Sequence, residues 1–284
     1  MKENEKLQAL TDNNEKETKS KGSYLTGKEI RKIAKANKKV MKRLEAYKYR
    51  KAPESEFTTS LKDTKNILEI DQLCTYFFTD QGVVKAVNGV SFDIPKNATV
   101  GVVGESGCGK STLLALASGM KLAQHGSVTW NTVEINQLSL DTIRSQVGYM
   151  GQDIYVFSGT VYDNIAMGDS TITMEQVQQA CAAIGFDKIV ETFAQGYNTL
   201  LGENGRGLSG GQKRMLGMAR ILVRDRKFVV CDEPLAGLDV QSEQMVYQAL
   251  NRLLEGRTAL LVSHREEIIH LADRVYFMEQ GKLR

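Results

Sequence analysis

The sequence predicts an α/β fold: a mixed, mostly parallel sheet combined with an antiparallel β subdomain and an inserted α-helical subdomain. Three observations predict it. Short continuous apolar runs such as ATVGVV and FVVC are typical of buried parallel strands. Apolar and polar residues alternate over ILEIDQLCTYFF, as in strands with one buried face. Helical periodicity fills the stretch between Gln152 and Arg220, for example in TMEQVQQACAAIGFDKIVETF.

Composition agrees with a globular protein of this class. The 284 residues are 42% hydrophobic and 25% charged. A chain of this length and composition can form a stable hydrophobic core without disulfide bonds or structural metals. No run approaches the about 18 apolar residues of a membrane-spanning helix, and the N-terminus has no apolar signal segment. We therefore expect a cytoplasmic protein with free thiols, because its cysteines lack CxxC spacing. These cysteines are Cys74, Cys108, Cys181 and Cys231.

The N-terminal part differs from the rest in charge. Residues 1–65 contain 18 Lys/Arg and 10 Asp/Glu, whereas the whole chain has a net charge of only +3. Residues 1–27 are polar, and we expect a disordered tail there. Residues 28–66 are predicted to form a basic amphipathic helix, over 28–51, and a linker. A solvated extension, a helix docking on a membrane surface or a partner, and, least favoured, a nucleic-acid contact all fit that helix.

From residue 67 onward the pattern is that of a folded domain, predicted to cover 67–284. Two antiparallel strands come first, over ILEIDQLCTYFF and VVKAVNGVSFDI. Parallel strands follow over ATVGVVG, KFVVCDEP and TALLVSH, and RVYFMEQGK is predicted to be an edge strand. The helical subdomain is expected at about 153–220.

The stretch GESGCGKS fits G-x-x-x-x-G-K-[ST], with an apolar strand before it and a helix after it. Gly104 and Gly109 leave room for backbone N–H groups to wrap around phosphate, and the helix N-terminus attracts the same anion. Lys110 can reach the β- and γ-phosphates, and the Ser111 hydroxyl can ligate Mg²⁺. This motif predicts a P-loop NTPase fold with a RecA-like sheet.

A second chemical motif ends the run FVVCDEP. Asp232 and Glu233 follow a predicted strand at the edge where open α/β sheets bind ligands. Asp232 can hold Mg²⁺, and Glu233 is placed to accept a proton from an attacking water. The sequence therefore predicts a site that binds phosphate and Mg²⁺ and activates a water, with Glu233 as the general base.

These residues resemble the ATP-binding cassette (ABC) ATPase family. LSGGQ at Leu208–Gln212 matches its signature, and Gln152 in GYMGQD resembles its Q-loop glutamine. LAGLD at Leu235–Asp239 resembles its D-loop, and His264 in LLVSHR its switch histidine. The resemblance covers about residues 67–284.

The resemblance implies a head-to-tail dimer in which the signature of one cassette closes on ATP held by the other. It implies an aromatic side chain stacked on adenine, for which Phe77 is favoured over Tyr76, with Phe78 also present. The expected ATP contacts are Tyr76 or Phe77, Gly104, Glu105, Ser106, Gly107, Cys108, Gly109, Lys110, Ser111, Thr112, Gln152, Ser209, Gly210, Gly211, Gln212 and Asp239. The expected catalytic residues are Glu233, His264, Gln152 and Lys110, and the expected Mg²⁺ ligands are Ser111, Gln152 and Asp232.

Two sub-family patterns occur in one chain. YFFTDQGVVKAVNGVSFDI and GESGCGKST resemble oligopeptide and dipeptide importer ATPases, whereas GYNTLLGENGRGLSGGQ and GRTALLVSHR resemble exporter cassettes. The resemblance implies a transporter subunit, for peptides or related substrates, that lies at the inner face of the cell membrane with its membrane-spanning partner on another chain. Import against export and homodimer against heterodimer stay open. The alternative is a non-transport ABC ATPase with soluble or nucleic-acid-associated partners.

Overall fold

The structure is a computed structural model that describes residues 28, 31, 35, 63, 65–79 and 82–284. The predicted tail, and almost all of the predicted basic helix and linker, lie outside these residues. No helix among the described residues is both long and apolar enough to cross a membrane. The chain divides into two compact units. The first comprises the described residues up to 93 together with 104–139 and 277–284, and the second comprises 94–103 and 140–276.

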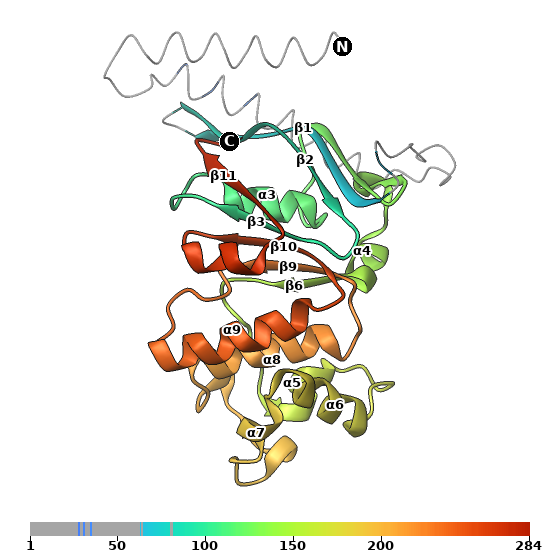
Figure 1. Ribbon diagram of the computed structural model, residues 1–284, viewed down its shortest axis with the longest axis vertical. Helices are drawn as coiled ribbons and strands as arrows, with labels where there is room; N and C mark the ends of the chain where they lie inside the picture. Colours follow the sequence, from blue (N-terminus) through green and yellow to red (C-terminus); the bar gives the residue numbers. More distant parts are fainter. Residues whose placement is uncertain (1–27, 29–30, 32–34, 36–62, 64, 80–81) are drawn as a thin grey trace. The chain divides into compact units, whose positions relative to one another are not determined.

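The first unit contains an antiparallel sheet with the strand order β2-β1-β4-β5 (Figure 1). These strands are β1 (Asn66–Thr79), β2 (Gly82–Pro95), β4 (His125–Trp130) and β5 (Val133–Glu134), with the last two residues of β2 assigned to the second unit. The same unit contains α3 (Lys110–Ala117), an eight-residue helix. Leu68 and Ile70 of β1 are at most 2% exposed, but Glu69 between them is also buried, so the alternating pattern alone does not predict which side chains of β1 are buried.

The second unit is built on parallel strands. They are β3 (Thr99–Val103), β6 (Val147–Met150), β9 (Phe228–Asp232) and β10 (Thr258–Ser263). Every residue of β3, β9 and β10 is buried, as the continuous apolar runs predict. β10 pairs in parallel with both β3 and β9, and β9 pairs in parallel with β6.

The prediction of an edge strand over RVYFMEQGK is wrong. The full sheet order is β12-β11-β3-β10-β9-β6, so β11 (Arg274–Glu279) lies between two other strands. Gln280 and Gly281 both have positive φ, at 48° and 77°, which is the geometry of a tight two-residue hairpin turn. The turn brings Lys282–Leu283 back as β12, which the sequence analysis did not predict.

Helices and two short strands complete the second unit. Threonine or serine begins three of these helices with a reciprocal capping box: Thr160 with Asp163, Thr173 with Gln176 and Ser209 with Gln212. The helices are α4 (Leu140–Gln146), α5 (Val161–Ala166), α6 (Met174–Ile184), α7 (Asp187–Val190), α8 (Gly210–Leu222) and α9 (Val240–Leu254), and the short strands β7 (Gly159–Thr160) and β8 (Leu200–Leu201) pair with each other.

One continuous apolar cluster forms the core of this second unit. It joins helices α5 to α9 to the sheet through buried side chains such as Val177, Leu216, Val229 and Leu250. Gly211 allows α8 and α9 to approach closely, because a Cβ there would lie 2.9 Å from the Cβ of Ser242. The helix that begins within the predicted signature, α8, and the helix that follows the predicted D-loop, α9, are therefore packed directly on each other.

Candidate functional site

The predicted phosphate loop connects β3 to α3. Gly107 and Gly109 have φ of 79° and 108°, in the region that favours glycine. A Cβ on Gly109 would overlap the carbonyl oxygen of Ala86 in β2, and one on Gly104 would overlap that of Met278. The loop therefore needs glycine at these positions for its conformation and for its packing within the first unit.

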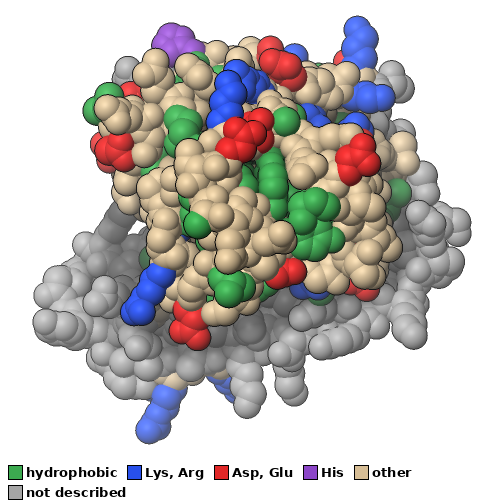
Figure 2. All heavy atoms as spheres, turned by 90° about the horizontal axis from the view of Figure 1, so that it is seen from below, with side chains coloured by type: hydrophobic (Ala, Val, Ile, Leu, Met, Phe, Trp, Pro, Cys, Tyr) green, Lys and Arg blue, Asp and Glu red, His purple; other side chains and the backbone are tan. Residues whose placement is uncertain are grey.

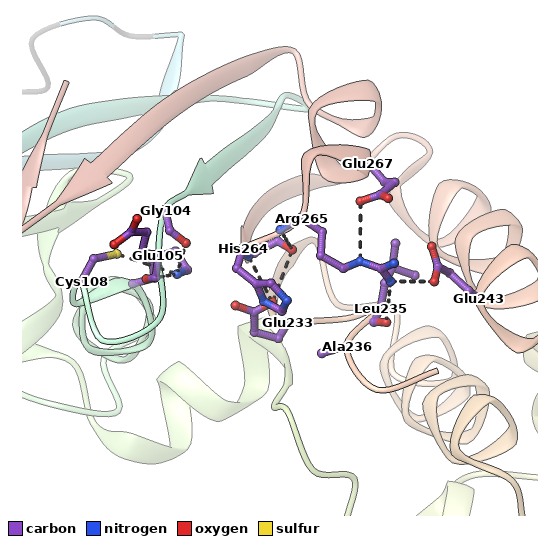
Figure 3. A network of polar contacts seen from close by, with 12 residues as sticks. Gly104, Glu105, Cys108, Glu233, Leu235, Ala236, Glu243, His264, Arg265 and Glu267 are labelled. Atoms are coloured by element: carbon purple, nitrogen blue, oxygen red, sulfur yellow. Dashed lines mark hydrogen bonds and ion pairs between the residues drawn. The ribbon is translucent and has the colours of Figure 1, made fainter. Parts of the chain in front are cut away.

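Lys110 is the charged group of this loop. It is 5% exposed, and its Nζ donates to the carbonyl oxygens of Gly104, at 2.6 Å, and Glu105, at 2.8 Å (Figure 3). The same Nζ lies 3.7 Å from Sγ of Cys108. The loop thus wraps around its own ammonium group, which keeps a positive charge where the motif predicts phosphate. A glycine-shaped cradle around a buried cation fits a polyphosphate ligand.

Glu233 and His264 come together in the second unit. Glu233 follows β9 with φ of 49°, and its N–H donates to the carbonyl oxygen of Val262 in β10 at 2.9 Å. Its Oε2 lies 2.8 Å from Nδ1 of His264 and accepts the His264 backbone N–H at 3.3 Å (Figure 3). The Ser263 hydroxyl donates to the same oxygen at 3.3 Å. The Glu233 side chain is 13% exposed, so one carboxylate oxygen is fixed in a sheltered place.

Strand register explains why these two groups meet. Ser263 of β10 is in register with Val103 of β3, and Val262 with Asp232 of β9. β3, β10 and β9 therefore end at the same edge of the sheet. His264 and Glu233 directly follow the ends of β10 and β9 in the chain, at the edge where α/β folds bind ligands.

The predicted signature residues begin α8. Ser209 is the N-cap, and its Oγ accepts the backbone N–H of Gln212 at 3.2 Å, while Gln212 Oε1 accepts the Ser209 N–H at 2.8 Å. The hydroxyl of the exposed Ser209 uses an oxygen lone pair for this cap, and its hydrogen can still be donated to an anion. Gly211 is buried against α9, so within this chain it serves helix packing.

The two described aromatic candidates for adenine stacking differ in exposure. Tyr76 is 2% exposed, and its hydroxyl donates to Oδ1 of Asn88 at 2.8 Å, so the structure argues against Tyr76 because its ring is part of the core. Phe77 is 40% exposed, with Nζ of Lys121 5.4 Å from its ring centroid. Phe77 therefore stays the favoured aromatic.

The remaining predicted residues lie at element ends. Gln152 is exposed just after β6, and Asp239 is the N-cap of α9, where its Oδ1 accepts the Ser242 N–H at 2.9 Å. That backbone bond lowers the pKa of Asp239 below its ordinary value. Asp232 is 8% exposed at the end of β9, and Ser111 is the second residue of α3.

The predicted Mg²⁺ ligands are residue types that suit magnesium. No cluster of three or more His, Cys, Asp or Glu that could hold a metal occurs within the described part of the chain. Mg²⁺ at phosphate sites needs no such cluster, because one carboxylate, a hydroxyl, substrate oxygens and waters complete its shell. Ser111, Asp232 and Gln152 offer the hydroxyl, the carboxylate and an amide oxygen.

Three further residues surround this chemistry and are not among those predicted from the sequence. Ser263 binds the Glu233 carboxylate, Arg265 binds the carbonyl oxygen of Leu235 at 3.3 Å, and Arg214 binds that of Gly151 at 3.0 Å. Ser263 and Arg265 flank His264 in the sequence, which is a signal that could have found them. Arg214 has no comparable signal, because its partners are backbone carbonyls distant in the chain.

A glycine loop around a buried lysine, followed along the chain by a strand-end carboxylate pair, defines a P-loop nucleotide-binding protein. The family model described as ABC transporter matches residues 87–236. The chain therefore belongs to the ABC transporter family, and it carries the ATP-binding domain that in this family hydrolyses ATP to power transport.

Individual relatives agree with this membership. An uncharacterized ABC transporter ATP-binding protein, YknV of Bacillus subtilis, is 38% identical over 198 residues, covering 70% of this chain and 33% of that protein. An ATP-dependent lipid A-core flippase of Chromohalobacter salexigens is 35% identical, covering 70% and 34%. P-glycoprotein 14 of Caenorhabditis elegans is 36% identical, covering 69% and 15%.

A solved structure confirms the fold. A bacterial Atm1-family ABC exporter with ATP bound matches with a TM-score of 0.69 and 27% identity, covering 80% of this chain and 39% of that one. The chain thus spans about a third or less of the length of these relatives. The importer-like pattern noted in the sequence has no support among these proteins and stays a prediction.

Proposed function

We propose that this chain hydrolyses Mg-ATP and that the resulting cycle of cassette closure and opening energises a membrane transporter. The observation that carries the hydrolysis step is the fixed carboxylate of Glu233. Three donors from consecutive residues, the Ser263 hydroxyl and the His264 backbone and ring, converge on its Oε2. A carboxylate held this firmly can orient a water and take its proton.

The other predicted residues have supporting roles in this proposal. Lys110 binds the β- and γ-phosphates in place of the carbonyl oxygens of Gly104 and Glu105. His264 binds the γ-phosphate and orients the attacking water. Bound Mg²⁺, held by Ser111 and Asp232 with Gln152 nearby, neutralises charge on the phosphates. Phosphoryl transfer needs mainly positioning and charge stabilisation, and these groups supply both.

Two cassettes share each ATP in the proposed active state. The helix dipole and the exposed Ser209 hydroxyl at the start of α8 form a second anion-binding end. The Lys110 loop of the same chain already supplies one phosphate-binding site. We therefore assign Ser209, Gly210 and Gly211 to ATP held by a second cassette, in a homodimer or a heterodimer.

The transporter contact is proposed for the face of the second unit that carries α5, α6 and α7. Hydrophobic side chains gather on this face (Figure 2). Large exposed apolar residues of this part of the chain are Tyr155, Met167 and Leu200, at 69%, 48% and 74% exposure. Leu200 pairs with Thr160 at the start of α5, Met167 caps the end of that helix, and Arg220 joins the Tyr155 carbonyl oxygen to that of Asn164 in α5. Such a patch fits the apolar side of a helix from a transmembrane partner.

Direction and substrate follow from the relatives only as proposals. The exporter favours export, and the lipid A-core flippase favours a lipid-like substrate, over import of the peptides that the importer-like sequence pattern predicts. The membrane-spanning partner on another chain and the place at the inner face of the membrane are kept as parts of the proposal.

Glu233→Gln tests the hydrolysis step. Turnover should fall roughly 10²- to 10⁴-fold because the amide cannot accept the water's proton. ATP affinity, measured by calorimetry with the full chain, should be unchanged. Glu255→Gln, which alters an exposed carboxylate at the end of α9, is the matched control. Equal turnover in Glu233→Gln and wild type would refute Glu233 as the base.

A test of the transport step requires identification of the membrane-spanning partner. We would capture the Glu233→Gln form with Mg-ATP from detergent-solubilised membranes of the source cells and identify co-purifying chains by mass spectrometry. A multi-span membrane protein, lost when Tyr155 and Leu200 are changed to Ser, would support the proposal. Capture of soluble partners alone, such as ribosomal or chromosomal proteins, would replace it with a non-transport ATPase.

A further inference from the structure

Two arginines hold consecutive carbonyl oxygens of the segment that follows Glu233. Arg265 donates to the carbonyl oxygen of Leu235 at 3.3 Å, and Arg214 donates to that of Ala236 at 3.4 Å. Both arginines belong to the second unit, but they come from different elements: Arg214 from α8 and Arg265 from the residues after β10. We name Arg214 and Arg265 the arginine clamp, and residues 235–239 the clamped loop.

Arg265 connects the clamped loop to the Glu233–His264 pair. Its backbone N–H donates to the Ser263 hydroxyl at 3.0 Å, and the same hydroxyl donates to the Glu233 carboxylate at 3.3 Å. Its guanidinium is anchored 2.6 Å from Glu243 Oε2 and 3.7 Å from the Glu267 carboxylate (Figure 3). A shift of Glu233 or His264 must therefore displace Arg265 or break one of these bonds.

Glu243 carries this connection to the far end of the clamped loop. It lies in the first turn of α9, and its N–H donates to the carbonyl oxygen of Asp239 at 2.8 Å. Asp239 in turn caps the helix through Ser242. The Arg265 and Glu243 side chains are only 29% and 21% exposed, so this ion pair is more sheltered from water than an ordinary surface pair. Arg265 thus holds both ends of the loop, at Leu235 directly and at Asp239 through α9.

Arg214 connects the same loop to the segment before Gln152. Its NH1 donates to the carbonyl oxygen of Gly151 at 3.0 Å, while its NH2 reaches Ala236. The side chain is 6% exposed, and this burial lowers the pKa of the guanidinium, although arginine stays protonated in proteins. Burying this cation among carbonyl oxygens is costly unless each bond is made, which favours a single position of the loop.

We propose that the arginine clamp positions residues 235–239 and couples them to Glu233, His264 and the Gln152 segment. Arg214 and Arg265 are positioning residues in this inference, since their side chains bind protein carbonyls and carboxylates. The inference deepens the proposed ATPase and rests on it for its kinetic consequence. Its structural consequence, a fixed loop, does not depend on hydrolysis.

The kinetic test is a double-mutant cycle on Arg265 and Glu243. Arg265→Met should lower kcat roughly 10- to 100-fold through misplacement of catalytic groups, with KM for ATP unchanged. Glu243→Gln should lower kcat less, because the amide still accepts a hydrogen bond. The double variant should resemble Arg265→Met, since both changes break one contact. Losses that multiply independently, or a changed KM with normal kcat, would overturn the inference.

Arg252→Met, an exposed arginine on α9, is the matched control and should leave kcat and KM as in wild type. Arg265→Lys keeps the charge but lacks the fork that reaches two acceptors, so its kcat should fall between wild type and Arg265→Met. If Arg265→Lys were as impaired as Arg265→Met while the control stayed normal, an ion pair with Glu243 would not be the source of the effect.

Hydrogen exchange tests the positioning directly in the nucleotide-free full chain. Arg265→Met and Arg214→Met should each accelerate amide exchange at residues 236–238, with exchange in β9 and β10 unchanged. Unchanged exchange in the loop would refute the clamp, whatever the ATPase result. An inactive wild-type chain with the expected exchange pattern would refute the proposed hydrolysis and leave the clamp standing.

Discussion

The choice of Phe77 as the adenine-stacking residue depends on side-chain exposure, which only the folded structure shows. The sequence offers three adjacent aromatic residues, and strand alternation cannot decide among them because both faces of β1 carry apolar side chains. Burial of Tyr76, with its hydroxyl bound to Asn88, leaves the exposed ring of Phe77 as the favoured candidate for the adenine contact. The motif residues were easier to predict, because the phosphate loop, Glu233 and His264 are set by local sequence.

We predict that Phe77→Ala weakens ATP binding by about 1–3 kcal/mol, the usual range for a lost base–aromatic stack. Phe77→Trp should bind about as well as wild type because it keeps a stacking surface. Calorimetry with a non-hydrolysed ATP analogue measures both. Phe277→Ala serves as the control, since that ring on β11 is 56% exposed and outside the phosphate loop. ATP affinity that stays the same in Phe77→Ala would assign the adenine contact elsewhere.

The elements show what the sequence pattern can and cannot predict. Long periodic segments such as α6 and α9, and continuous apolar runs such as β3 and β10, follow from local residue patterns. The two-residue strands β7 and β8 have no such pattern, because pairing over about 40 residues of chain defines them. The arginines that join α8 to its neighbours are equally non-local.

Arg220 on α8 is the clearest of these element-level contacts. It donates to the carbonyl oxygens of Asn164 and Tyr155, both at 2.7 Å, and burial lowers its pKa to about 10. Asn164 lies near the C-terminal end of α5, where helix carbonyls lack partners and favour a cation. The contact fixes the proposed docking face of α5 to the helix that begins with Ser209.

We predict that Arg220→Met lowers the free energy of unfolding by roughly 1–3 kcal/mol, because the part-buried carbonyl oxygen of Asn164 and the carbonyl oxygen of Tyr155 lose their donor. Urea denaturation of the full chain, followed by circular dichroism, measures the midpoint. Arg144→Met on α4 removes an exposed arginine and should leave the midpoint unchanged. A midpoint for Arg220→Met equal to that of the control would mean that water replaces the guanidinium at no cost.

Sharing of each ATP between two cassettes would be a property of the dimer and not of a single chain. Sharing predicts that a chain with a defective phosphate loop can be rescued by a chain with a defective signature. Lys110→Met removes the loop cation while keeping its aliphatic length. Ser209→Asp keeps an excellent N-cap for α8 and places a negative charge where the partner's phosphate is expected. Each variant alone should be nearly inactive, because both of its sites contain a defect.

Mixing the two variants should restore ATPase activity. Random pairing makes half of the dimers mixed, and each mixed dimer has one intact and one doubly defective site, so activity should recover to about a quarter of wild type. The mixture of Lys110→Met with Glu233→Gln is the matched control, because both defects act on ATP held by their own chain. If sites are not shared, neither mixture recovers, and Ser209 then acts within its own chain. If Ser209→Asp is active alone, Ser209 is not involved in catalysis. Recovery in the first mixture alone establishes that catalysis belongs to the pair of cassettes and not to the single chain.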